Sequence, residues 1–305
     1  MPNPETLKQI AQTAGLSLAN STGLFPAHHQ AGDVGLPMLV VDNALGHAVI
    51  ALQGAHLMSF VPKGRNDLFW VSPKTLLQPD TPIRGGIPLC LPWFGPGPGP
   101  DGKSMHGFAR TREWSLVESC ALDSGETLLA FELSGDASTC ALWPHAFHFR
   151  LDVKVGSTLT LGMTVTNTGN DDAPVAFAFH SYFAVPSVAQ ARVGGLEGCT
   201  YIDKMDNFAR KTQEGEVGID SVTDRIYLDV PAQQSVISTA GDILVESDAR
   251  CAVVWNAWSN DKNIADLGEG NHVGYLCVER GDVADRAVTV APGASYRTWM
   301  ILARA

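Results

Sequence analysis

The sequence lacks long hydrophobic runs, CxxC pairs and an excess of positive charge. No stretch of about eighteen apolar residues occurs in the 305-residue chain, which argues against a transmembrane helix. With 32 Asp and Glu against 21 Lys and Arg, the formal net charge is −11, so no overall positive field attracts nucleic acid or an anionic membrane. An anionic ligand therefore requires a local concentration of cations.

Cysteine spacing and the N-terminal residues point to a reducing compartment. The six cysteines are scattered singly through apolar stretches, a pattern that predicts neither a disulfide framework nor a zinc site. The first twenty residues carry an acid where a secretory signal has basic residues, and they contain no continuous apolar core. We therefore expect a cytoplasmic protein with reduced thiols.

Short β-type segments make up most of the chain. They are rich in Val, Ile, Leu, Thr and aromatic residues, and Gly, Pro, Asn or Asp separate them. Residues 149–156 and 157–167 alternate apolar and polar side chains, as half-buried antiparallel strands do. We expect strands within 37–43, 47–62, 67–73, 127–135, 147–156, 157–169, 174–183, 235–241, 243–248, 251–258, 273–279, 287–293 and 295–305.

The fold class follows from the near absence of helical patterns. Apolar residues at helical spacing predict one short helix over 6–14, which Gly15 ends. More than a dozen strands without a βαβ rhythm indicate an all-β sandwich or barrel. The stretch PGPGPDG at 96–102 is interpreted as a loop within one domain. We expect an N-terminal helix and lead-in segment over 1–35 and a single β-sandwich domain over 36–305.

The densest group of cations lies in a glycine- and proline-rich segment, PIRGGIPLCLPWFGPGPGPDGKSMHGFARTREW. Arg84 precedes two glycines, and Arg110 follows the sequence HGFA. Proline and glycine fix the direction of a loop and let its backbone approach a ligand. Guanidinium groups bind phosphate or carboxylate through two parallel hydrogen bonds. The alternative is that both arginines pair with acidic residues of the surface.

Two charged side chains stand near the ends of apolar strands. His180 follows PVAFAF, and Glu279 follows VGYLCV. Such a group is either a solvated strand end or a side chain that points into a cleft. A single histidine on an apolar strand is often a satisfied core residue, and a glutamate before Arg-Gly often begins a loop. The strand pattern alone leaves both readings open.

The ordered motifs resemble a known superfamily. PIRGGIPLCLPWFG, HGFARTREW, FAFHSYF, TDRIY, VVWNAW and CVERGDV occur in the order seen in the aldose 1-epimerase (galactose mutarotase-like) superfamily. Within it, the chain looks most like the D-hexose-6-phosphate epimerases, also called glucose-6-phosphate 1-epimerases, from about residue 36 to residue 302. The resemblance implies a β-supersandwich and an interconversion of α and β anomers that needs no metal and no cofactor.

The resemblance also implies catalytic roles. His180 corresponds to the general acid that protonates the ring oxygen, and Glu279 to the general base that takes the proton of the anomeric hydroxyl. An acid and a base on opposite sides of one C–O bond can exchange roles when the ring closes again. A histidine near its usual pKa and an ionised carboxylate suffice at neutral pH, so we expect no large pKa shift.

Four further residues are expected to bind the substrate. His106 corresponds to a histidine that contacts the sugar near the ring oxygen, and Arg84 and Arg110 to the arginines that hold the phosphate. Asp224 corresponds to an aspartate that hydrogen-bonds sugar hydroxyls, with Asp203 as the competing candidate.

One departure from the family pattern and two alternative functions remain open. Met105 stands where some relatives have glutamine, so an amide hydrogen bond is missing. A mutarotase for unphosphorylated sugars would leave the two arginines without an anion to bind. A non-catalytic sugar-phosphate-binding protein would be expected to lose the catalytic pair, which is present. We expect a monomeric enzyme whose partner is a hexose 6-phosphate, without nucleic acid or membrane.

Overall fold

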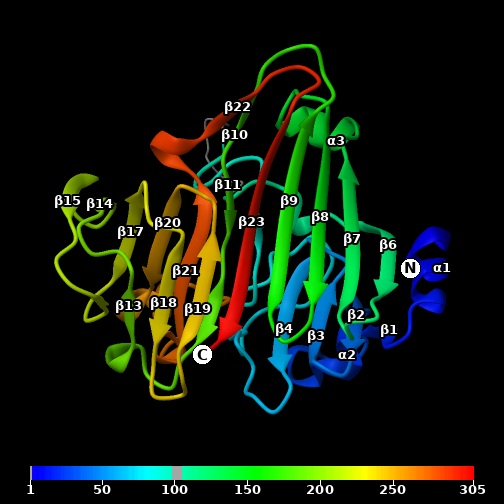
Figure 1. The fold of residues 1–305 in the computed structure, drawn as a ribbon, viewed down its shortest axis with the longest axis horizontal. Coiled ribbons are helices and arrows are strands. Elements are labelled where there is room, and N and C mark those ends of the chain that lie inside the picture. Colours follow the sequence, from blue (N-terminus) through cyan, green and yellow to red (C-terminus); the bar gives the residue numbers. More distant parts are fainter. Residues whose placement is uncertain (1, 98–104) are drawn as a thin grey trace.

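The computed structural model describes residues 2–97 and 105–305 (Figure 1). Its architecture is all-β, as the sequence predicts, and every strand pair within the named sheets is antiparallel. Most of the loop predicted over 96–102 lies outside the described residues. No helix of the described residues is long and apolar enough to cross a membrane.

Two large sheets and two smaller ones form the molecule. The largest has nine strands in the order β16 (Val217–Gly218), β13 (Arg192–Gly194), β18 (Gln233–Ile237), β19 (Ile243–Ser247), β23 (Ser295–Arg304), β9 (Leu159–Asn167), β8 (Phe147–Val155), β7 (Thr127–Ser134) and β6 (Ser115–Ala121). The eight-stranded sheet has the order β15 (Ala209–Thr212), β14 (Thr200–Asp203), β17 (Thr223–Leu228), β20 (Cys251–Asn256), β21 (Tyr275–Asp282), β11 (Phe177–Phe179) and β5 (Leu89–Cys90), and β12 (Tyr182–Ala184) also pairs with β21.

The smaller sheets lie beside them. The four-stranded sheet contains β1 (Leu16–Asn20), β2 (Pro37–Asp42), β3 (Gly46–Ala51) and β4 (His56–Pro62), and the two-stranded one β10 (Ala173–Val175) and β22 (Val288–Val290). In Figure 1 the four-stranded sheet lies toward the β6–β8 end of the largest sheet, and β17, β20 and β21 lie toward its β18–β19 end. The boundary between 1–35 and 36–305 stays a prediction, although β1 pairs with β2 across it.

The helix predicted near the N-terminus is present and begins two residues earlier. α1 runs from Pro4 to Gln12, because the side chain of Asn3 caps it by accepting a hydrogen bond of 2.8 Å from the backbone N–H of Thr6. Two further short helices, α2 (Ser21–Leu24) and α3 (Ala137–Leu142), were not predicted.

The prediction of a strand over 67–73 is wrong. This segment makes only isolated bridges, from Phe69 to Phe183 and from Val71 to Gly85. The carboxylate of Asp67 accepts hydrogen bonds of 3.0 Å from the backbone N–H groups of Phe60 and Phe69. A side chain therefore takes the place of the ladder partner that a regular strand would need.

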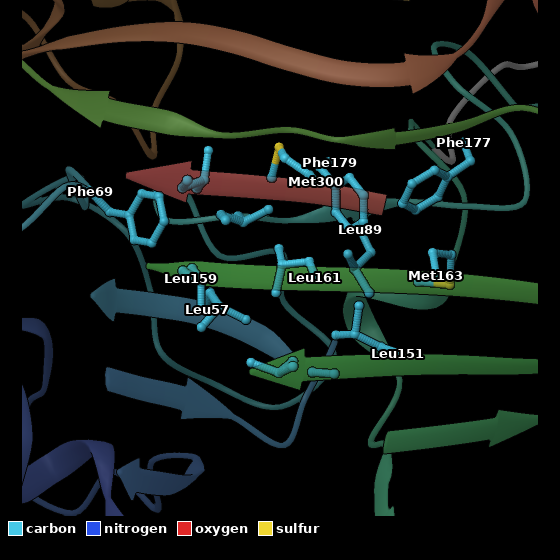
Figure 2. Packing of buried hydrophobic residues seen from close by; sticks show 14 of the residues in the cluster. Leu57, Phe69, Leu89, Leu151, Leu159, Leu161, Met163, Phe177, Phe179 and Met300 are labelled. Atoms are coloured by element: carbon cyan, nitrogen blue, oxygen red, sulfur yellow. The ribbon is translucent and has the colours of Figure 1, made fainter. Parts of the chain in front are cut away.

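The main core lies between the nine-stranded sheet on one side and the eight-stranded and four-stranded sheets on the other. β8 and β9 alternate buried and less buried residues along their length. Figure 2 shows the buried side chains Leu151, Leu161 and Met163 facing Leu89 of β5 and Phe179 of β11. Because successive strand residues point to opposite faces, β21 sends Leu276 and Val278 into this core and leaves its other face for the site.

Candidate active site

All six residues predicted for the site line one cavity of about 230 Å³, on the face of the eight-stranded sheet that points away from the main core. Five residues that were not predicted for the site, Met105 among them, also line it. The lining consists of Arg84, Phe94, Met105, His106, Arg110, His180, Lys204, Asp224, Val253, Trp255 and Glu279. A larger groove of about 710 Å³ beside the N-terminal segment contains none of the six.

Strand register brings the acidic groups together. On β21, Glu279 lies opposite Val253 of β20, and on the next pair Trp255 of β20 lies opposite Asp224 of β17. Alternation along each strand directs these four side chains to the same face of the sheet. Glu279 is 1 % exposed, so the carboxyl group lies at the floor of the cavity and not at a solvated strand end.

His180 lies in the short connection between β11 and β12. Its backbone N–H donates a 3.0 Å hydrogen bond to the carbonyl oxygen of Pro88, and its imidazole is stacked on the ring of Tyr182. Its Nε2 lies 3.4 Å from Oε1 of Glu279. Among the described residues, neither Nδ1 of His180 nor Oε2 of Glu279 has a hydrogen-bond partner. The pair is therefore buried and free to contact a ligand.

The expectation that neither catalytic candidate has a large pKa shift is wrong. Burial lowers the pKa of His180 well below its usual value, and the nearby His106 and arginines lower it further. Burial raises the pKa of Glu279 well above its usual value, Asp224 raises it further, and Lys204 opposes this. Both shifts act in the same sense, because each disfavours the charged form of its group in the buried pair.

The two arginines have different surroundings. Arg84 donates from Nε and Nη2 to the two carboxylate oxygens of Asp266, at 3.1 and 3.0 Å, and from Nη1 to the hydroxyl of Tyr182 at 3.0 Å. Arg110 donates from Nη2 to the carbonyl oxygen of Met105 at 2.7 Å. Its Nε is buried without a hydrogen-bond partner, and no carboxylate of the described residues forms an ion pair with it. Among the residues that the structure describes, Arg110 therefore has no counter-ion.

His106 is held in a strained turn. Its φ is +62°, and its backbone N–H donates to the carbonyl oxygen of Gly95 at 2.7 Å while the N–H of Gly95 donates to its Nδ1 at 3.3 Å. A Cβ on the next residue, Gly107, would collide with the backbone of Leu91. Burial and the surrounding cations lower the pKa of His106 to about 3. The ring is therefore neutral, and with Nδ1 accepting, Nε2 presents an N–H to the cavity.

The structure separates the two candidate aspartates. Asp224 lines the cavity and forms an ion pair of 2.7 Å with Lys204. Asp203 forms an ion pair of 2.8 Å with Lys211 and is not part of the lining. Lys204 itself was not predicted, although it follows Asp203 directly in the sequence YIDK. Nothing in that motif distinguishes it from a surface lysine at the end of a strand.

Met105 takes part through its backbone. Its carbonyl oxygen holds Arg110, and its side chain is 43 % exposed at the cavity rim. Because any residue supplies that carbonyl group, replacing an amide side chain here leaves the arginine in place.

One group in the described residues has metal-ligating spacing. One ligand atom each of His180, Cys277 and Glu279 lies within 4.8 Å of the others. Arg84, Arg110 and Lys204 line the same cavity, and their positive charge disfavours a divalent cation there. Burial also raises the pKa of the Cys277 thiol well above its usual value, which works against the thiolate that a metal needs.

Comparison with known proteins identifies the family. The aldose 1-epimerase family matches residues 37–303. A protein of Cenchrus ciliaris named "Putative glucose-6-phosphate 1-epimerase" is 33 % identical, with 82 % of this chain and 79 % of that protein covered. A Salmonella typhimurium protein of the same name is 34 % identical, with 80 % and 82 % covered.

A solved structure gives the same result. The crystal structure of a "putative mutarotase" from Salmonella typhimurium superposes with a TM-score of 0.81 at 31 % identity, over 90 % of this chain and 92 % of that one. The resemblance seen in the motifs is therefore confirmed, together with the mutarotase-like sandwich. The chain belongs to the aldose 1-epimerase family and is an isomerase that interconverts sugar anomers.

Proposed function

We propose that the protein is a glucose-6-phosphate 1-epimerase, which interconverts the α and β anomers of a hexose 6-phosphate. The observation that carries this proposal is Arg110, which shares a cavity with a histidine–glutamate pair, has a buried Nε without a hydrogen-bond partner and forms no ion pair with a carboxylate of the described residues. A neutral sugar gives such a group nothing to neutralise it. The cavity of about 230 Å³ suits one monosaccharide, and the named relatives above support the choice of glucose 6-phosphate.

In the proposed reaction His180 and Glu279 act on the two oxygens bonded to C1. Glu279 takes the proton of the anomeric hydroxyl, the bond between C1 and the ring oxygen breaks, and His180 protonates the ring oxygen. The open-chain aldehyde rotates about its C1–C2 bond. Closure on the other face returns each proton and gives the other anomer, so the pair ends with the one proton it had at the start.

The negative charge of the substrate favours the protonated form of His180. The reaction as written begins with a proton on His180, whose pKa burial lowers in the free protein. The cations Arg84 and Arg110 are among the groups that lower the pKa of His180. A phosphate dianion beside them offsets their field and thereby favours the imidazolium. Nε2 of His180 and Oε1 of Glu279 lie 3.4 Å apart, so the two groups can exchange a proton directly.

The phosphate is held mainly by Arg110. Arg84 already has a carboxylate partner in Asp266, so its charge is largely neutralised, and Lys204 is paired with Asp224. Gripping the phosphate at C6 orients C1 against the acid and base, which is binding energy used for positioning. His106 and Asp224 supply a donor and an acceptor for sugar oxygens.

We also infer that the enzyme is cytoplasmic and monomeric and binds no nucleic acid. The net charge of −11 supports the last point.

Anomer exchange followed by magnetisation-transfer NMR tests the proposal. Glucose 6-phosphate and free galactose are compared with wild type, Arg110→Gln and Arg112→Gln. Arg112 lies two residues away and does not line the cavity, so it serves as the matched control. We expect exchange of glucose 6-phosphate to be preferred, and its KM to rise roughly 10- to 100-fold in Arg110→Gln alone, the value of a lost charge-assisted hydrogen bond.

Equal acceleration of both sugars, or a preference for galactose, would show that the enzyme is a mutarotase for neutral sugars. Binding of glucose 6-phosphate without any accelerated exchange would show a non-catalytic binding protein.

A further inference from the structure

We propose that Tyr182 is the positioning residue of His180, and that Asp266 and Arg84 hold Tyr182 in its place. The inference rests on the proposed function only for the role of His180 as proton donor. None of the sequence motifs suggested a part for Asp266 or Tyr182.

His180 lacks the hydrogen-bonded support that orients many catalytic histidines. Its Nδ1 is buried and has no hydrogen-bond partner among the described residues, and its Nε2 faces Glu279. In a Ser-His-Asp triad the corresponding nitrogen donates to a carboxylate, which fixes the ring. Here the orientation of the imidazole has to come from the rings around it.

Tyr182 supplies the closest of these ring contacts. Its ring is stacked on the imidazole with centroids 4.8 Å apart and an interplanar angle of 5°. The other two neighbours, His106 and Trp255, meet the imidazole edge-on at 5.5 and 6.1 Å. Tyr182 is 1 % exposed and does not line the cavity, so it acts through His180 and not on the substrate.

Tyr182 is in turn fixed at both its hydroxyl and its ring. The hydroxyl accepts a hydrogen bond of 3.0 Å from Nη1 of Arg84, whose other edge is locked on Asp266. Trp70 and Tyr275 pack against the ring at centroid distances of 6.1 and 5.4 Å. A phenol held in this way cannot slide along the imidazole without breaking a charge-assisted hydrogen bond.

The arrangement links the anion end of the cavity to the acid. Arg84 also lines the cavity, so a phosphate that contacts it contacts the same group that pins Tyr182. The π-face of Tyr182 attracts a cation, which favours the imidazolium at the moment of proton donation. Asp266, Arg84 and Tyr182 thus form a chain from the phosphate site to the donor.

The first test compares Tyr182→Leu, which removes the stacked ring, with Tyr182→Phe, which removes only the hydroxyl. Tyr275→Phe is the matched control, because its phenol accepts a hydrogen bond of 3.1 Å from the Ala257 N–H in the same aromatic cluster but is not stacked on His180. We expect kcat to fall roughly 100-fold in Tyr182→Leu, the effect of a misplaced group. In Tyr182→Phe the loss is below about tenfold, as for one hydrogen bond. KM for glucose 6-phosphate stays within about twofold in both variants, since Tyr182 does not touch the substrate.

Nitrogen NMR of the His180 ring, assigned by its loss in His180→Gln, gives a readout that does not depend on activity. The ring shifts should move most in Tyr182→Leu, move less in Tyr182→Phe, and be unaffected in Tyr275→Phe. Unchanged shifts and unchanged kcat in a folded Tyr182→Leu would overturn the proposal. If wild type showed no exchange while the shifts moved as expected, the proposed function would fail and the positioning chain would stand.

Asp266→Asn separates positioning from phosphate binding. Loss of the carboxylate frees the Arg84 guanidinium from Tyr182 and also makes it a stronger anion ligand. We expect kcat to fall severalfold while KM for glucose 6-phosphate falls or stays unchanged. A rise in KM with kcat unchanged would mean that Asp266 serves only to aim Arg84 at the phosphate, which would contradict the chain.

Discussion

The nine-stranded and eight-stranded sheets differ in where they place polar side chains. β8 and β9 of the nine-stranded sheet alternate buried apolar residues with more exposed, mostly polar ones, and only the last residue of β9, Asn167, is both buried and polar. β21 of the eight-stranded sheet is buried along all eight residues, three of which are ionisable: Glu279, Arg280 and Asp282. The nine-stranded sheet buries mainly apolar side chains, which stabilises the fold. The eight-stranded sheet also buries ionisable side chains, which costs stability.

Neighbouring charges on β21 show which kind of burial serves function. Arg280 points to the core side and donates to the backbone carbonyls of Ala232 and Ala249 at 3.1 and 2.5 Å, and also to Gln234. Glu279 points to the cavity and leaves Oε2 without a partner. The Nη groups of Arg280 are satisfied within the protein, although its buried Nε has no partner, whereas the unpartnered oxygen of Glu279 belongs to a residue that lines a cavity able to hold a ligand.

The largest effect on activity is expected from Glu279→Gln. Without the base, kcat for anomer exchange should fall by about 10²- to 10⁴-fold, the usual contribution of a general base. The melting temperature should not fall, because the amide has the same shape and carries no charge in a site that disfavours charge. Activity assays and thermal unfolding on the same preparation measure both. A destabilised Glu279→Gln with normal kcat would reverse the comparison between the sheets.

Leu161→Ala in β9 should show the opposite behaviour. Leu161 is fully buried in the main core, so its truncation should lower the free energy of unfolding by about 2–5 kcal/mol. The cavity residues lie on the other face of the eight-stranded sheet, so kcat of the folded fraction at 25 °C should match wild type. Urea unfolding and single-temperature kinetics test this. A kcat loss comparable to that of Glu279→Gln would mean that the two sheets are not functionally distinct.

The smallest expected effect is a shift in the basic limb of the pH profile of kcat/KM. Along this limb the His180–Glu279 pair loses the one proton that it needs, and within the pair Asp224 raises the pKa of Glu279 while Lys204 lowers it. Asp224→Asn should therefore move the limb to lower pH, and Lys204→Met should move it to higher pH. Measurements above pH 7 avoid the second ionisation of the phosphate near 6. Shifts of both variants in one direction would contradict the assignment of the limb to the His180–Glu279 pair.

The sequence predicts the nine-stranded sheet better than the eight-stranded one for a physical reason. The alternation in residues 147–167 is typical of strands with one solvent-exposed and one buried face, and β8 and β9 follow this pattern. β5, β14, β15 and β17 of the eight-stranded sheet were not predicted, and in the nine-stranded sheet β6, β13 and β16 were missed. β15, with the sequence ARKT, is a polar edge strand, and β17 mixes charged with apolar residues because its Asp224 faces a polar cavity.

Motif resemblance located the site residues, and the strand pattern alone did not. His180 and Glu279 stood out as charges beside apolar runs, but their partnership depends on the pairing of β11, β12 and β21, which no local pattern encodes. The same holds for Lys204 and Asp266, which ordinary loop sequence surrounds. The pKa shifts were missed because burial depends on what the remainder of the chain places over a group.

Anomer exchange of glucose 6-phosphate by wild type and by the double variant His180→Gln/Glu279→Gln tests the central claim most directly. The double variant keeps every cation of the cavity and removes only the acid and the base. We predict that wild type accelerates the exchange well above the spontaneous rate, and that the double variant binds the sugar phosphate without accelerating it. Acceleration that persists in the double variant would show that the chemistry does not belong to this pair.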